Sequence, residues 1–139
     1  MIYNISELTL KALRFSPKGA NVEIPQIARV TGGHATARRN ENNEPVSGSI
    51  SKIVLTALDA AKAKILAENG ISASEMKGFT IEIEADEQQL KAIDLVELVG
   101  SEISLANAEL APLWVSRGQN GSYSGLKVII HEVKQEGGK

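Results

Sequence analysis

The sequence predicts a small α+β protein built around an antiparallel β-sheet. Short runs rich in β-branched and aromatic residues recur along the 139-residue chain and are separated by turn residues. Strand-like runs do not alternate regularly with helical ones, so a parallel doubly wound sheet is not expected. For about five or six such strands, a small, partly closed barrel plugged by a helix is the economical packing, because closure removes exposed strand edges.

The composition is that of one globular domain over residues 1–139, with 42% hydrophobic and 23% charged residues. The chain contains no cysteine, which excludes disulfides and cysteine-based metal sites and fits a cytoplasmic protein. No basic, apolar leader opens the sequence, and no apolar run approaches the roughly 20 residues of a membrane helix. No membrane partner is therefore expected.

The first elements in chain order are two extended segments, residues 8–16 and 22–30, which together predict a hairpin. Residues 31–49 are polar, contain glycine and have no periodicity, so we predict a long flexible loop there. His34, Arg38 and Arg39 of this segment supply donors that suit phosphate. The alternative is an ordinary surface loop.

Residues 50–68 predict the long inserted helix. Their apolar residues follow a helical spacing, namely Ile50, Ile53, Val54, Ala57, Leu58, Ala61 and Ile65. Ser49 is a suitable N-cap, and Asn69-Gly70 is a standard end signal. The apolar stripe is expected to pack against the sheet.

A half-buried strand is predicted at residues 79–84, where apolar residues alternate with Thr80, Glu82 and Glu84. Residues 86–93 then predict a short helix with an acidic cap. Periodicity does not decide whether residues 95–99 continue as helix or form a strand. Glu82 and Glu84 lie on one side of their strand, where a divalent cation or, more simply, solvent would meet them.

The clearest strand signal is a β-hairpin formed by residues 113–115 and 126–130, with a glycine-rich tip between them. Arg117 and Tyr123 lie in the tip, and Trp114 lies just inside it. A cation and two aromatic residues on one hairpin would suit a groove for single-stranded nucleic acid. Trp114 would serve equally well to anchor a loop or an oligomer contact. The tail, residues 135–139, is expected to be frayed.

Charge is distributed unevenly, although the net charge is only −2. Residues 11–39 sum to +5, and residues 82–109 sum to −7. This asymmetry indicates either a positive and a negative face or ordinary surface charge that is uneven only in sequence.

No catalytic motif is present. The two histidines, His34 and His131, are far apart in sequence, and the glycine-rich hairpin tip has neither Walker nor dinucleotide-binding spacing. We therefore expect a binding protein that is not an enzyme, with no metal ion and no cofactor.

The segment from Ile93 to Gly100, with the runs 113–115 and 123–128, resembles the C-terminal barrel strands of small OB-fold-like single-stranded DNA-binding proteins of plasmids, phages and conjugative elements. This resemblance covers about the last third of the chain and rests on pattern. It implies an OB-like barrel and sequence-tolerant binding of single-stranded DNA in replication or transfer. Trp114, Arg117 and Tyr123 would line the groove.

Five further residues complete the candidate nucleic-acid site. Arg29, Arg38 and Arg39 would take phosphates, and His34 lies in the same loop as the last two. Lys127 is placed on the hairpin face that carries Tyr123. That face is amphipathic, so it would also suit a homo-oligomer contact.

The competing hypothesis is a protein-interaction or structural module, such as a phage assembly subunit or a small inhibitor of a host complex. It predicts that the basic segment forms no continuous patch with the hairpin. It also predicts that the apolar hairpin face is buried in an oligomer.

Overall fold

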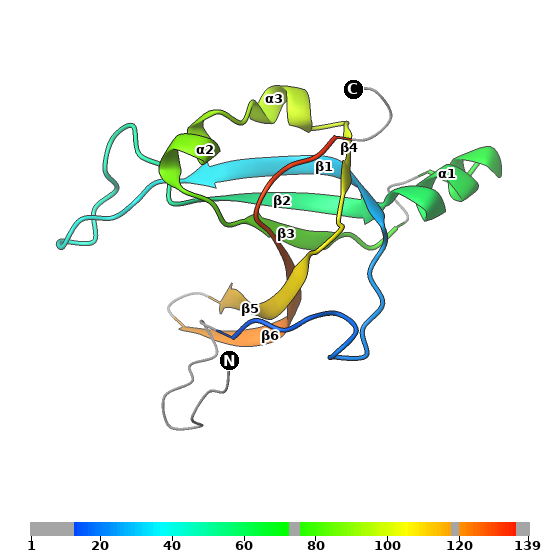
Figure 1. Cartoon of the computed structure of the whole chain (residues 1–139), viewed down its shortest axis with the longest axis horizontal. Coiled ribbons are helices and arrows are strands. Elements are labelled where there is room, and N and C mark those ends of the chain that lie inside the picture. The colour runs from blue at the N-terminus through cyan, green and yellow to red at the C-terminus, as the bar shows by residue number, and fades with distance from the viewer. Residues whose placement is uncertain (1–12, 73–75, 118–119, 136–139) are drawn as a thin grey trace.

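The computed structural model describes residues 13–72, 76–117 and 120–135, which form a small α+β structure (Figure 1). In these residues six strands and three helices follow one another along the chain. Their order is β1 (Ile27–Thr36), β2 (Lys52–Asp59), α1 (Ala60–Glu68), β3 (Phe79–Ile83), α2 (Glu87–Lys91), α3 (Leu95–Leu98), β4 (Glu102–Ser104), β5 (Glu109–Arg117) and β6 (Asn120–Ile130).

The strands form one sheet with the order β4-β1-β2-β3-β6-β5. Every neighbouring pair is antiparallel except β3 and β6, which are parallel. The sheet is not closed, and β4 and β5 lie at its two edges. After β6 the chain returns to β4, where the Ser104 amide donates to the Lys134 carbonyl at 2.8 Å and Ile103 pairs with Gln135. Figure 1 shows the resulting bend, in which β6 climbs from the β5–β6 hairpin past β3 toward the helices.

The core lies on the inner face of this bent sheet. Alternate residues of the strands point inward and are at most 4% exposed, namely Val30, Ile53, Leu55, Ala57, Ile81, Ile83, Leu110, Val128 and Ile130. Leu90 of α2 and Leu98 of α3 cover one end of the cluster and are 1% and 2% exposed. Burial of these aliphatic side chains is the main stabilising contribution to the fold.

The long helix predicted over residues 50–68 is wrong in its first half. Residues 52–59 are strand β2, and only residues 60–68 are helical. The apolar spacing fits both structures, because Ile53, Leu55 and Ala57 also alternate with more exposed neighbours. Pairing with β1 on one side and β3 on the other decides in favour of the strand.

The helix α1 begins at the Asp59 cap, whose carboxylate accepts from the Lys62 amide at 3.2 Å. At the other end, Gly70 adopts a positive φ of 75°. This left-handed conformation favours glycine and agrees with the end signal that the sequence contains.

The long loop predicted over residues 31–49 begins too early. Strand β1 continues to Thr36, so the connection to β2 covers residues 37–51, which we call the β1–β2 loop. Hydrogen bonds order this loop, since Arg39 pairs with Pro45 and the Arg38 amide donates to the Ser49 hydroxyl at 2.9 Å. Such local pairing does not appear in residue periodicity.

The hairpin predicted from residues 8–16 and 22–30 does not form in the described part of these segments. Phe15 pairs with Leu110 of β5, whereas β1 pairs with β2 and β4. Residues 8–12 lie outside the described residues.

Three other predictions are confirmed or decided. Strand β3 and the capped helix α2 occupy the expected places, with a complete capping box between Asp86 and Gln89. The undecided segment after α2 is helical, because Asp94 accepts from the amides of Val96 and Glu97.

The predicted C-terminal hairpin is present as β5 and β6. Its strands reach Arg117 and Asn120, so most of the expected tip is strand. In the tail, Gln135 pairs with Ile103, and residues 136–139 lie outside the described residues.

Candidate binding face of the sheet

The outer face of the sheet is the side opposite the core. Cross-strand register places three rows of residues on it across β1, β2 and β3. These rows are Gly32–Thr56–Thr80, His34–Val54–Glu82 and Thr36–Lys52. Most of these side chains are small or polar, and none of them belongs to the core cluster. Ile129 of β6 extends the middle row beside Glu82.

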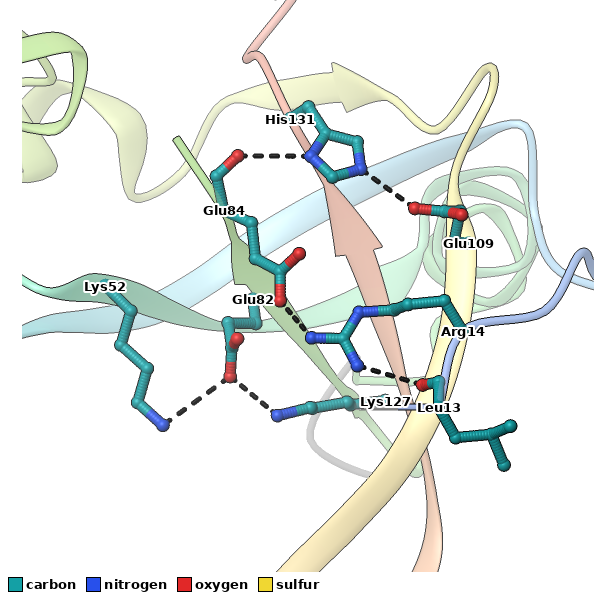
Figure 2. Close-up of polar contacts among 8 residues, drawn as sticks. All are labelled: Leu13, Arg14, Lys52, Glu82, Glu84, Glu109, Lys127 and His131. Atoms are coloured by element: carbon teal, nitrogen blue, oxygen red, sulfur yellow. Dashed lines mark hydrogen bonds and ion pairs between the residues drawn. The ribbon is translucent and has the colours of Figure 1, made fainter. Parts of the chain in front are cut away.

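Glu82 is the centre of the charge on this face, and its side chain is only 8% exposed. Its carboxylate accepts from Lys127 Nζ at 2.7 Å and lies 3.5 Å from Lys52 Nζ (Figure 2). Burial by itself would raise the pKa of Glu82, but the hydrogen bonds and charges of Lys127 and Lys52 together lower it. Glu82 therefore stays ionised and holds two lysines from the strands on either side.

A second group of contacts lies beside Glu82. Arg14 pairs with the Glu84 carboxylate and donates to the Leu13 carbonyl at 2.9 Å (Figure 2). His131 follows β6, and its Nδ1 lies 3.2 Å from the Glu84 carbonyl oxygen while its Nε2 lies 2.9 Å from Glu109. These contacts tie the ends of β3, β5 and β6 together.

The His131 ring gains a proton more readily than an ordinary histidine. The hydrogen bond to the Glu109 carboxylate raises the pKa of His131, although partial burial opposes this. Both ring nitrogens then donate to their acceptors.

The β1–β2 loop is attached to α2 through Glu87. The Glu87 carboxylate accepts from Arg38 Nε at 2.9 Å and from the Ile50 amide at 3.2 Å, and Lys91 lies 3.3 Å away. Desolvation would raise the pKa of Glu87, but the Ile50 amide, Arg38 and Lys91 lower it. One carboxylate thus fixes both ends of the loop.

The β5–β6 hairpin presents Trp114, which is 53% exposed. Its indole lies against Gly121, where an added Cβ would stand 2.5 Å from Trp114 Cζ2. Any side chain at position 121 would therefore force the indole to move. Tyr123 pairs with Trp114, and Arg117 pairs with Asn120, but only the backbones of Tyr123 and Arg117 are described.

The predicted phosphate-binding residues are placed as follows. His34 lies exposed on the outer face, and Arg38 and Arg39 lie in the β1–β2 loop, where Arg39 donates to the Asn43 carbonyl at 2.9 Å. Arg29 lies toward the other end of β1 and pairs with Glu102 at 3.2 Å. The structure therefore does not bring Arg29 together with the loop residues.

Of the two interpretations of the charge asymmetry, separate positive and negative faces are contradicted at three positions. Ion pairs join Arg14 to Glu84, Arg29 to Glu102 and Arg38 to Glu87, so the basic and acidic segments meet residue by residue. Opposite charges that lie 49 to 73 residues apart in sequence become neighbours through strand and helix packing. Net charge per segment cannot reveal such pairing.

Sequence reasoning did not identify Lys52 and Arg14 as members of the charged group. Lys52 falls within the segment for which the sequence predicts a helix, and the strand register places it beside Glu82 instead. The sequence leaves Glu82 and Glu84 to solvent or to a divalent cation, whereas in the structure they are partners of lysine and arginine. In residues 13–72, 76–117 and 120–135, no group of three or more acidic or histidine side chains could hold a metal ion.

Comparisons of the chain with family models, with curated proteins and with solved structures gave no significant match. Within the described ranges, no helix has the length and apolar character needed to cross a membrane. The geometry of the outer face, the β1–β2 loop and the β5–β6 hairpin therefore carries the functional argument.

Proposed function

We propose that this protein binds single-stranded DNA, without catalysis, across the outer face of β2 and β3. One observation carries the proposal. The β1–β2 loop and the β5–β6 hairpin project toward the same end of the molecule, on the left in Figure 1, with β2 and β3 between them. OB-fold proteins bind oligonucleotides on the corresponding face, between the corresponding loops.

The strand connectivity supports an OB-like, partly closed barrel as the framework. Strands β1, β2 and β3 form an antiparallel meander, β3 then pairs in parallel with the last strand, and helices occupy the connection from β3 to β4. The return of residues 134–135 to β4 brings the far edge of the sheet back toward β6. These features support the proposal of a five-stranded Greek-key barrel, with β4 and β5 in the place of one bent strand.

The outer face, the β1–β2 loop and the β5–β6 hairpin together offer the two interactions that sequence-tolerant binding requires. Trp114 presents an exposed indole on which a base can stack, a contact worth about 1–3 kcal/mol per base. Lys52, Arg38 and Arg39 are exposed cations within reach of the same face or its loop. Phosphate neutralisation by such groups makes binding salt-dependent.

The test is a titration of the protein with a single-stranded oligothymidylate and with a duplex of equal length, at two salt concentrations. Trp114 is the sole tryptophan, so its fluorescence reports directly on the hairpin. We expect quenching by the single strand, weakened by salt and much smaller with the duplex. The double variant Arg38→Ala with Arg39→Ala should weaken binding and flatten its salt dependence. Absence of quenching together with absence of a mobility shift would refute the proposal.

A protein-interaction module is the second candidate, and two observations favour it. The charges of Arg29, Arg38 and Lys127 are already paired with carboxylates. In addition, Trp114 and Leu126 are 53% and 41% exposed on a hairpin whose strand β5 is a sheet edge. Exposed apolar side chains on an edge strand suit pairing with a second copy or with another protein.

The two candidates differ in what Trp114→Ala does. For a nucleic-acid binder it lowers affinity for the oligonucleotide and leaves the mass in solution unchanged. For a homo-oligomer, Trp114→Ala lowers the mass measured by light scattering, and the oligonucleotide changes the mass of neither the wild type nor the variant.

A further inference from the structure

Three cations of the proposed nucleic-acid face are held by two carboxylates of the same chain. Glu82 lies between Lys127 at 2.7 Å and Lys52 at 3.5 Å, and Glu87 accepts from Arg38 at 2.9 Å. Carboxylate and phosphate oxygens accept the same charge-assisted hydrogen bonds from lysine and arginine. The two glutamates therefore hold cations that could also donate to phosphates of a bound strand.

We propose that Glu82 and Glu87 compete with nucleic-acid phosphates for Lys52 and Arg38, so that binding proceeds by exchange of carboxylate for phosphate. The inference rests on the proposed function and concerns how that site is regulated. The affinity of the protein for a single strand is then set by its own carboxylates.

Exposure decides which of these contacts can exchange. The side chains of Arg38 and Lys52 are 54% and 43% exposed, so each can turn toward a phosphate while the backbone stays in place. Lys127 is only 18% exposed and keeps its short contact to Glu82. The Arg38–Glu87 pair is partly exposed, and such pairs contribute little to stability, so its exchange has a small cost. Glu82 keeps Lys127 as a partner when Lys52 turns away. A phosphate beside Lys52 would still meet the negative charge of Glu82, which weakens binding.

Removal of that negative charge should therefore tighten binding. Glu82→Gln keeps an oxygen that accepts from Lys127 and leaves Lys52 and Lys127 without a competing carboxylate. Glu87→Gln does the same for Arg38. Glu68→Gln is the matched control, because it changes the net charge equally and lies at the end of α1, at the opposite side of the molecule in Figure 1.

The experiment measures the dissociation constant of a fluorescent 20-nucleotide oligothymidylate for the wild-type protein and the three variants, between low and moderate salt. We expect Glu82→Gln and Glu87→Gln to bind roughly 3–10-fold more tightly at low salt, with a salt slope steeper by about 0.7 for each phosphate gained. Glu68→Gln should change affinity less than about twofold, since charge at that distance is screened.

The outcomes separate the inference from the function on which it rests. Binding by wild type, with neither glutamine variant tighter than Glu68→Gln, overturns the exchange and leaves the proposed function intact. Failure of all four proteins to bind overturns the proposed function and the exchange together. Because Glu82 is buried, Glu87→Gln decides the question if circular dichroism shows that Glu82→Gln is unfolded.

Discussion

Replacement of Gly121 by alanine tests the contact that positions Trp114 on the β5–β6 hairpin. A Cβ at this position would lie 2.5 Å from Trp114 Cζ2 and 2.6 Å from Cε2. Carbon atoms in ordinary contact are about 3.5–4.0 Å apart, so the indole must move by roughly 1 Å or leave the strand. The clash involves the side chain alone, since Gly121 is not among the glycines with positive φ.

The expected loss of stability follows from the partial burial of this ring. Overpacking costs about 1–3 kcal/mol in a closed core. Trp114 is 53% exposed and can move toward solvent, so the cost should fall at the lower end, about 1–2 kcal/mol. For a chain of 139 residues this corresponds to a decrease in Tm of roughly 3–8 °C.

Urea unfolding followed by circular dichroism measures the stability, and the emission maximum of the sole tryptophan reports its surroundings. We expect Gly121→Ala to shift the emission to longer wavelength and to lower the unfolding midpoint. Gly32→Ala is the control, because nothing lies within 4 Å of its added Cβ on the outer face. Identical emission and stability in Gly121→Ala and wild type would refute the described packing of Trp114 on Gly121.

Three further predictions concern the sheet and its charged groups. Leu55→Ala should lower the free energy of unfolding by about 2–5 kcal/mol, because Leu55 is fully buried in β2. Urea titration measures this change, and a decrease below about 1 kcal/mol would contradict the place of Leu55 in the core. Glu82→Ala should destabilise the protein by about 1–3 kcal/mol at pH 7, because it leaves Lys127 partly buried without its partner. The pKa of Glu82 is lowered in the folded protein, so its contribution to stability is present above the ordinary value of 4.5 and is lost as the pH falls through the folded pKa. The difference in Tm between wild type and Glu82→Ala should therefore shrink in acid. The pKa of His131 is raised in the folded protein, so its contribution to stability is complete below the ordinary value of 6.5 and is lost as the pH rises through the folded pKa. His131→Gln should therefore lower the Tm more at pH 5.5 than at pH 8.5. The difference should be small because the His131 side chain is 54% exposed. An equal decrease in Tm at both pH values would count against the His131–Glu109 contact.

Elements whose signals are local can be predicted from the amino-acid sequence alone. Asp86 and Gln89 lie three residues apart and form the capping box of α2 wherever that segment is placed. Strand β3 follows from its alternation, and the C-terminal hairpin follows from two β-branched runs joined by turn residues. Such patterns need only neighbouring residues, which is why they could be read without a structure.

Tertiary contacts are needed to distinguish strand from helix over residues 52–59. The apolar residues of this segment satisfy both periods, and the backbone hydrogen bonds that make it a strand come from β1 and β3, which are distant in sequence. The same reason governs the candidate site. Lys52 meets Glu82, and Arg38 meets Glu87, only because the sheet and α2 bring together residues that sequence keeps 30 or more positions apart. Charge and side-chain type are properties of the sequence, whereas the partner that neutralises each charge is a property of the fold.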